Sequence, residues 1–227
     1  MKLRILVGSL LVWGSFPGWA MPGIGALALS GGRSFCAFSP FLNRSEKIEE
    51  SASFQVKKGD RKADAEQLAR ALDYFSSEKF HECLVLLQPL NRRYKLNPRY
   101  RAYLAVCLYY EWEYAEAIRL FDEVIPLLQG LAPHELSLYY WMDAESYFAL
   151  QQYDRALPLY EKMLPLCRDN EKPDAYYRMG FCHLFAEERK KAKECFELSL
   201  EGYLKYRNTP KEKARIAQIR HMIGGLK

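Results

Sequence analysis

The residues Tyr-Ala-Glu-Ala-Ile at 114–118 decide the fold, because variants of this stretch recur along the chain. The variants are Phe-His-Glu-Cys-Leu at 80–84, Tyr-Asp-Arg-Ala-Leu at 153–157 and Arg-Lys-Lys-Ala-Lys at 189–193. The fourth residue is small each time, at Cys83, Ala117, Ala156 and Ala192, with separations of 34, 39 and 36 residues. Self-similarity at such a period indicates stacked units that cannot bury their apolar faces alone.

Two further columns repeat with the same separations. A second column of small residues consists of Ala71, Ala105, Ala144 and Gly180. A column of large apolar residues consists of Leu87, Phe121, Tyr160 and Phe196. Small residues let two helices approach closely and large residues fill the gap to the next unit, so the columns predict pairs of packed helices.

This pattern resembles the tetratricopeptide repeat (TPR), which has small residues at repeat positions 8 and 20 and large ones at 11, 17 and 24. Position 11 is occupied by Tyr74, Leu108, Tyr147 and His183, and position 17 by Phe80, Tyr114, Tyr153 and Arg189. The resemblance covers about residues 64–203, and the fourth repeat departs from it at both aromatic columns. It implies an all-α fold, a right-handed α-solenoid of about four TPR-like helix pairs over residues 63–208. The separations of 39 and 36 predict longer turns at 129–133 and 169–173.

A C-terminal capping helix is predicted over residues 209–227. Thr209 is the expected N-cap, Pro210 the first helical residue and Glu212 the partner in a capping box. The apolar stripe of this helix consists of Ile216, Ile219, Met222 and Ile223. Gly224 and Gly225 are expected to end it.

Residues 1–20 have the features of a signal peptide. Lys2 and Arg4 precede an uncharged apolar run at 5–16, and cleavage is expected after Ala20, with Ala28 as the second candidate. The chain is therefore expected to be exported to the periplasm or secreted, as an exported bacterial member of the family. The alternative is an N-terminal membrane anchor at 5–29, although prolines and glycines interrupt that stretch. Residues 21–62 form an irregular apolar segment and a charged linker.

Charge argues against a nucleic-acid-binding protein. The chain has 227 residues and a net charge of +5, and residues 186–227 carry 11 Lys or Arg against 6 Asp or Glu. Residues 1–185 are balanced at 22 of each, so the excess is confined to the C-terminal end. That basic end is a candidate contact for anionic lipid or an acidic partner. It consists of Arg189, Lys190, Lys191, Lys193, Lys205, Arg207, Lys211, Lys213, Arg215 and Arg220.

Motifs that carry chemistry are few, so no enzyme, cofactor or metal is predicted. The four histidines lie far apart, and His183 replaces a packing aromatic, which favours a core role. Neither a G-x-S-x-G elbow nor a P-loop occurs in the sequence. The cysteines lie mostly within repeat helices, where thiols pack as small apolar groups. Cys182 and Cys195 fall on facing helices, so a bridge between them is one alternative.

The resemblance also implies a ligand groove lined by the first helix of each pair, at repeat positions 2, 5, 9, 12 and 13. The side chains it assigns to this groove are Leu68, Leu72, Phe75, Arg99, Val106, Tyr109, Tyr110, Trp141, Glu145, Phe148, Tyr177, Phe181 and Phe185. Most are apolar or aromatic, and contiguous exposed apolar surface usually marks a binding site. The alternative is that some of these side chains pack between repeats.

The expected function is a non-catalytic scaffold or chaperone that binds an apolar or aromatic peptide or helix of a protein partner. Similar bacterial proteins act in envelope assembly and secretion. One alternative is a cell-envelope enzyme with Glu145 as general acid, and another is a self-assembling structural protein. The apolar residues 24–42 are expected to occupy the groove as a placeholder, or that of a second chain in a homodimer.

Overall fold

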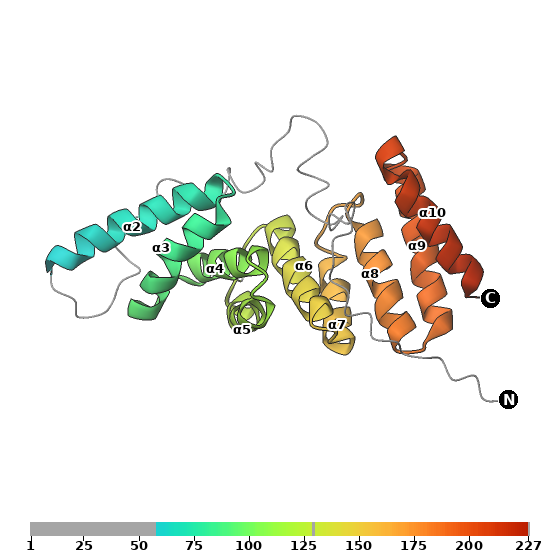
Figure 1. Ribbon diagram of the computed structural model, residues 1–227, viewed down its shortest axis with the longest axis horizontal. Coiled ribbons are helices and arrows are strands. Elements are labelled where there is room, and N and C mark those ends of the chain that lie inside the picture. Colours follow the sequence, from blue (N-terminus) through green and yellow to red (C-terminus); the bar gives the residue numbers. More distant parts are fainter. Residues whose placement is uncertain (1–57, 129, 227) are drawn as a thin grey trace, which may run out of the picture. The chain divides into compact units, whose positions relative to one another are not determined.

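The computed structural model describes residues 58–128 and 130–226, which fold into α-helices, short 3-10 helices and turns (Figure 1). The α-helices are α2 (Lys58–Ser76), α3 (Phe80–Arg93), α4 (Pro98–Tyr110), α5 (Tyr114–Val124), α6 (Pro133–Ala149), α7 (Tyr153–Met163), α8 (Lys172–Phe185), α9 (Arg189–Tyr206) and α10 (Lys213–Gly225). From α2 to α10 each helix packs on the next one along the chain, and α4 also contacts α6. The predicted all-α solenoid of helix pairs is confirmed.

The predicted signal peptide, its cleavage sites and the placeholder segment 24–42 lie outside the described residues. Helix α2 begins at Lys58, within the range predicted as linker. We refer to α2, α4, α6 and α8 as the A helices and to α3, α5, α7 and α9 as the B helices. The predicted longer turns are present, since α6 begins only at Pro133 and α8 at Lys172.

The three repeating columns form the centre of the core. Both columns of small residues and the column of large residues are buried in every repeat. At Gly180 the approach is closer than alanine allows, because a Cβ atom there would lie 2.6 Å from a ring carbon of Phe196. The sequence spacing therefore identified the contacts between the helices of each pair.

The turn between the A and B helix has the same backbone form in all four pairs. One residue in each turn has a left-handed φ, namely Glu78 (58°), Trp112 (66°), Gln151 (59°) and Glu187 (62°). The next amide donates to a carbonyl five residues back, as from Lys79 to Tyr74, at 2.9 Å. This bond satisfies a carbonyl that the helix end leaves open. Glycine usually occupies such a position, and here none of the four residues is glycine.

The capping helix packs as predicted, but its start differs. Ile216 and Ile219 of α10 are buried in one cluster with Phe196 of α9, and Met222 and Ile223 pack against that cluster. Thr209 makes no side-chain cap, and Pro210–Glu212 forms a 3-10 turn before α10. The predicted capping box is wrong because the Glu212 carboxylate accepts a hydrogen bond from Arg207 at 2.7 Å instead.

Candidate functional site

The residues predicted to line the groove divide into buried and accessible sets. Those in the core are Leu68, Phe75, Val106, Trp141, Glu145 and Tyr177, each with 6% or less of its surface exposed. Their assignment as ligand contacts is corrected, because these six side chains are buried in the core. The half-buried residues are Leu72, Arg99, Tyr109, Tyr110, Phe148 and Phe181. Phe185 is 52% exposed. We call these seven accessible residues the A-helix face.

Aromatic rings meet edge to face at the turn end of each of the first three pairs. The ring centroids of Phe75 and Phe80 are 5.9 Å apart, at an interplanar angle of 74°. The corresponding pair Tyr109–Tyr114 is also at 5.9 Å, and Phe148–Tyr153 is at 5.0 Å. Edge-to-face contacts of this kind stabilise by about 0.5–1.5 kcal/mol beyond the burial of area. They hold the last turn of each A helix against the first turn of its B helix.

Two further contacts join neighbouring repeats by parallel stacking. Phe80 of α3 stacks on Tyr110 of α4 with ring centroids 4.0 Å apart and planes parallel. Tyr153 of α7 stacks on Phe185 of α8 at 4.4 Å and 22°. Both contacts connect position 17 of one repeat with position 13 of the next. Phe185 is thus positioned from its buried side and still presents half of its surface to solvent.

A buried ion pair lies beneath the A-helix face. The Arg178 guanidinium of α8 donates to the Glu145 carboxylate of α6 at 2.6 Å, and the Tyr160 hydroxyl donates to the same carboxylate. Arg178 also lies over the Phe148 ring, 4.6 Å from its centroid. Burial and the negative charge of Glu145 raise the pKa of Tyr109 well above its ordinary value.

The proposed acid role of Glu145 does not fit this geometry. A general acid needs a proton on its carboxyl group and a place for substrate beside it. Glu145 is 6% exposed, and its two carboxylate oxygens accept hydrogen bonds from Tyr160 and Arg178, which leaves no place for substrate beside it. Its role is to neutralise and position Arg178, and with it the rings around that guanidinium.

Arg99 was predicted as a ligand contact, but its side chain forms a second ion pair within the protein. Its Nε and Nη2 atoms donate to the two carboxylate oxygens of Glu135, at 3.2 and 2.8 Å. The Tyr139 hydroxyl donates to Glu135 at 3.0 Å. Glu135 is 1% exposed, so this bidentate pair joins α4 to α6 inside the protein. The sequence did not identify Glu135, because its partner lies one repeat away.

Asp143 is a buried acid that no motif in the sequence marks. It lies on α6, is 1% exposed, and its Oδ1 atom has no hydrogen-bond partner among the described residues. Burial, and secondly the nearby charge of Asp122, raise the pKa of Asp143 to about 8. Asp122 itself accepts from Tyr147 at 2.5 Å and lies 3.7 Å from Arg155. Asp143 therefore binds a proton more tightly than an exposed aspartate does.

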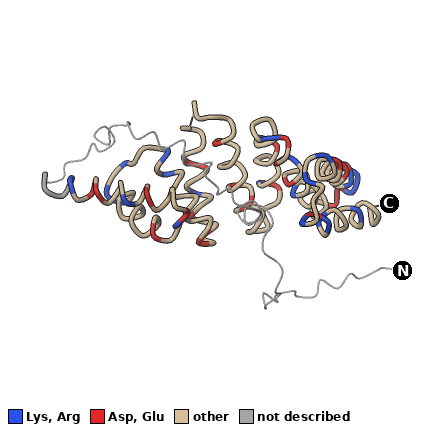
Figure 2. The backbone as a smooth tube through the Cα atoms, turned by 90° about the horizontal axis from the view of Figure 1, so that it is seen from above, with Lys and Arg blue, Asp and Glu red and all other residues tan. Residues whose placement is uncertain are grey.

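Several of the C-terminal basic residues are used within the fold. The Arg207 guanidinium donates to Asp174 and Glu212, and Arg215 lies over the Tyr177 ring at 4.1 Å. Lys191 pairs with Glu188 at 2.8 Å. Figure 2 shows Lys and Arg interspersed with Asp and Glu at this end of the chain. The exposed members without an ion pair that the structure records are Arg189, Lys190, Lys205, Lys213 and Arg220.

The cysteines and the candidate metal residues offer no built site in the described part of the chain. Cys182 and Cys195, the pair considered for a bridge, are free thiols, as are Cys83, Cys107 and Cys167. Burial raises the pKa of Cys182 to about 12, so this thiol stays protonated at neutral pH. Within residues 61–226 no three His, Cys, Asp or Glu side chains come together as a metal site. His183 is buried and bonds Glu188 at 2.6 Å, which confirms its place in the core.

Comparisons with known proteins agree with this fold. MamA AMB-1 is 14% identical and covers 73% of this chain and 85% of its own, with a TM-score of 0.57. A MamA RS-1 double mutant is 18% identical, covering 72% and 93%, with a TM-score of 0.51. MamA from Desulfovibrio magneticus RS-1 is 16% identical, covering 72% and 92%, with a TM-score of 0.50.

These similar structures are TPR-type proteins, and the chain has the tetratricopeptide-repeat fold. No protein-family profile and no curated protein matches the sequence. None of the helices in the described part of the chain is long and apolar enough to span a membrane.

Proposed function

We propose that this protein is a non-catalytic interaction module, a scaffold or chaperone that binds an apolar or aromatic peptide or helix of a protein partner on its A-helix face. The observation that carries the proposal is the accessible aromatic surface of α4, α6 and α8, above all Phe185, which is 52% exposed. Stacking on Tyr153 and the neighbouring Phe181 hold this ring in place before any ligand arrives. Rigid aromatic anchors are the side chains that most often dominate binding energy.

The buried ion pairs support this role by fixing the surface. Arg178–Glu145 and Arg99–Glu135 connect successive A helices, and the carboxylate of each pair is buried. Such paired charges hold neighbouring helices in one register, which keeps the rings above them pre-organised. A partner therefore meets a surface that needs little ordering on binding.

Export belongs to the same proposal. We infer that residues 1–20 direct the chain to the periplasm or out of the cell, and that its partner acts in envelope assembly or secretion. N-terminal sequencing of the mature protein tests the export step. The expected first residue is Met21, or Leu29 if the second cleavage site is used, and an intact N-terminus in the membrane fraction would support the anchor instead.

The apolar residues 24–42 are proposed to compete with the partner or to join two chains. The test compares a chain that begins at Met21 with one that begins at Ser45. Loss of residues 21–44 is expected to raise the binding of an apolar fluorescent dye, or to abolish a dimer. If dye binding falls and both chains are monomeric, the placeholder idea fails.

Co-purification from an extract of the source cells tests the interaction role. The matched variants are Phe185→Glu, on the A-helix face, and Val85→Glu, at a residue of α3 that is 55% exposed. Both place one charge at a half-exposed apolar position, and melting curves check that both fold. We expect Phe185→Glu to lose a partner that Val85→Glu and the wild type retain. Equal recovery by both variants would contradict binding at this face.

A further inference from the structure

The stacking between repeats has a regular form. A ring at position 17 of one repeat stacks on a ring at position 13 of the next, as Phe80 does on Tyr110 and Tyr153 on Phe185. The centroid distances of 4.0 and 4.4 Å are those of stacked rings in contact. These contacts join the first pair to the second and the third pair to the fourth.

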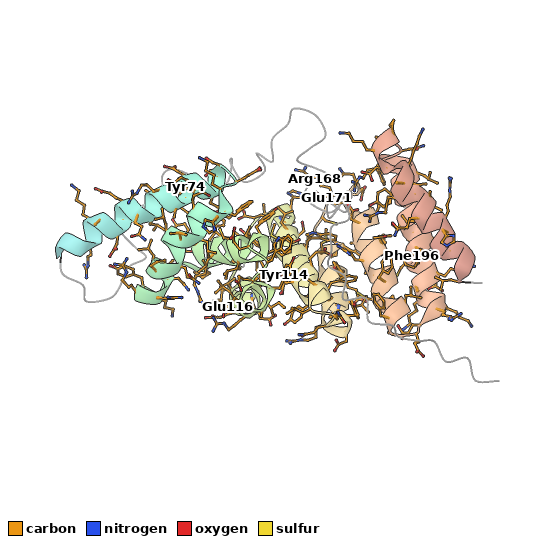
Figure 3. The ribbon with its side chains drawn as sticks, in the orientation of Figure 1. Tyr74, Tyr114, Glu116, Arg168, Glu171 and Phe196 are labelled. Carbon is orange, nitrogen blue, oxygen red and sulfur yellow. The ribbon has the colours of Figure 1, made fainter. Side chains whose placement is uncertain are left out.

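The junction between the second and third pairs has an aromatic ring at position 17 but no aromatic ring at position 13 of the next repeat. Tyr114 of α5 is that ring, and position 13 of the next repeat is Ala149, at the end of α6. Among the described residues the ring contact recorded for Tyr114 is with Tyr109 of its own repeat, at 5.9 Å and 60°. Helix α5 packs on α6, and Figure 3 labels Tyr114 where the two meet. A methyl group thus replaces a ring at one junction of three.

Tyr114 and Ala149 both remain partly exposed, so solvent reaches part of each side chain. The turn that precedes Tyr114 is acidic, and the Glu145 and Arg178 charges that also act on Tyr114 belong to one ion pair. Residues 102–118 contain Glu111, Glu113 and Glu116 but no Lys or Arg, and Figure 3 labels Glu116 on the same helix as Tyr114. Arg119 pairs with Glu116 and His81 with Glu111, which leaves the exposed Glu113 without an ion pair that the structure records.

We propose that a protein partner inserts one aromatic side chain, flanked by Lys or Arg, into the α5–α6 junction, where it stacks on Tyr114 over Ala149. The inference rests on the proposed interaction function and names the residue type that the surface selects. The partner ring takes the place that Tyr110 and Phe185 occupy at the other two junctions. The flanking cations complement the acidic turn between α4 and α5.

The variant that tests this is Ala149→Phe, which supplies the missing ring from the protein itself. Its control is Ala115→Phe, which adds the same ring at an exposed position of α5. The probes are dye-labelled, blocked peptides with the central sequences Lys-Phe-Lys, Glu-Phe-Glu and Lys-Ala-Lys. Fluorescence anisotropy with the full chain measures the dissociation constant of each, and melting curves report the stability of each variant.

We expect Lys-Phe-Lys to bind at least about tenfold tighter than the other two peptides, and Ala149→Phe to weaken it by about tenfold while Ala115→Phe leaves it unchanged. Ala149→Phe is also expected to melt at or above the wild-type temperature, because its ring completes a stack.

A lower melting temperature would show that no ring-sized space exists and would overturn the inference. So would equal affinity of the two variants, or failure of all three peptides to bind the wild type. Failure of Ala149→Phe to fold counts in the same way. Tyr114→Leu, which removes the ring on which the partner side chain stacks, must also weaken the binding of Lys-Phe-Lys. The co-purification experiment judges the proposed function separately, since it depends on Phe185.

Discussion

Replacing Asp143 by asparagine should stabilise the protein at neutral pH and remove a pH dependence. An unfolded Asp has a pKa near 3.8, whereas burial raises the pKa of Asp143 in the fold to about 8. Between these two values the folded protein holds a proton that the unfolded chain has released. The free energy of unfolding therefore falls as pH rises, by at most about 1.4 kcal/mol per pH unit. Below the unfolded pKa the carboxyl group is neutral in both states, and the loss disappears.

The magnitude follows from the burial of the group. Asp143 is 1% exposed, so solvent screening does not reduce the effect. The charges that face it are Asp122 on α5, which raises its pKa, and Arg155 and Lys162 on α7, which lower it. From about pH 4 to pH 7 the linkage amounts to about 4 kcal/mol as an upper limit, and we expect about 2–4 kcal/mol.

Urea denaturation followed by circular dichroism measures this effect. We expect the wild type to lose stability from about pH 5 to pH 8, and Asp143→Asn to lose much less over the same range. The control is Asp154→Asn at an exposed position of α7, which should follow the wild type. Parallel curves for the wild type and Asp143→Asn would refute the reasoning, because they would mean that Asp143 titrates alike in both states.

Three further substitutions test the packing. Gly180→Ala should lower the free energy of unfolding by about 1–3 kcal/mol, because its Cβ would lie 2.6 Å from the Phe196 ring. The control is Gly224→Ala, whose Cβ would have no neighbouring atom within 4 Å, and it should raise the free energy of unfolding by up to about 1 kcal/mol. Equal effects in urea titrations would contradict this contact. Gln151→Gly should stabilise by about 0.5–1 kcal/mol by relieving a φ of 59°, and a lower midpoint would count against strain at that turn. Ala156→Asp, at a position with 0% exposure, should unfold the array, and an unchanged circular dichroism spectrum and melting temperature would mean that the repeat register is wrong.

The repeat columns were predictable because packing repeats locally. Position 8 must be small wherever two helices cross, so Gly180 and Ala144 appear in one column although their neighbours differ. The burial of Phe196 and the place of His183 follow from the same spacing. A period in the sequence thus reports contacts that recur with that period.

Features that join different repeats were not predictable in this way. Arg178 lies 33 residues from Glu145, and Arg99 lies 36 from Glu135, so neither pair has a local signal.

Some local features were also missed. The predicted capping box does not form because Arg207, outside the motif, competes for Glu212. The left-handed turn residues Trp112 and Gln151 carried no glycine to reveal them. Val106 and Trp141 are buried, and the repeat pattern alone did not separate such buried positions from the accessible ones.

The most direct test of the interaction role is photo-cross-linking from single positions in the full chain. A photoreactive phenylalanine at Phe148 or Phe185 samples the A-helix face, and the same group at Val85 or Leu198 samples exposed positions on the B helices. Exposure to an extract of the source cells should give a discrete protein adduct from the first two positions only. Mass spectrometry should place the cross-link on an apolar or aromatic segment of the partner. Adducts of equal yield from Val85 and Leu198, or from the B helices alone, would contradict binding at the A-helix face.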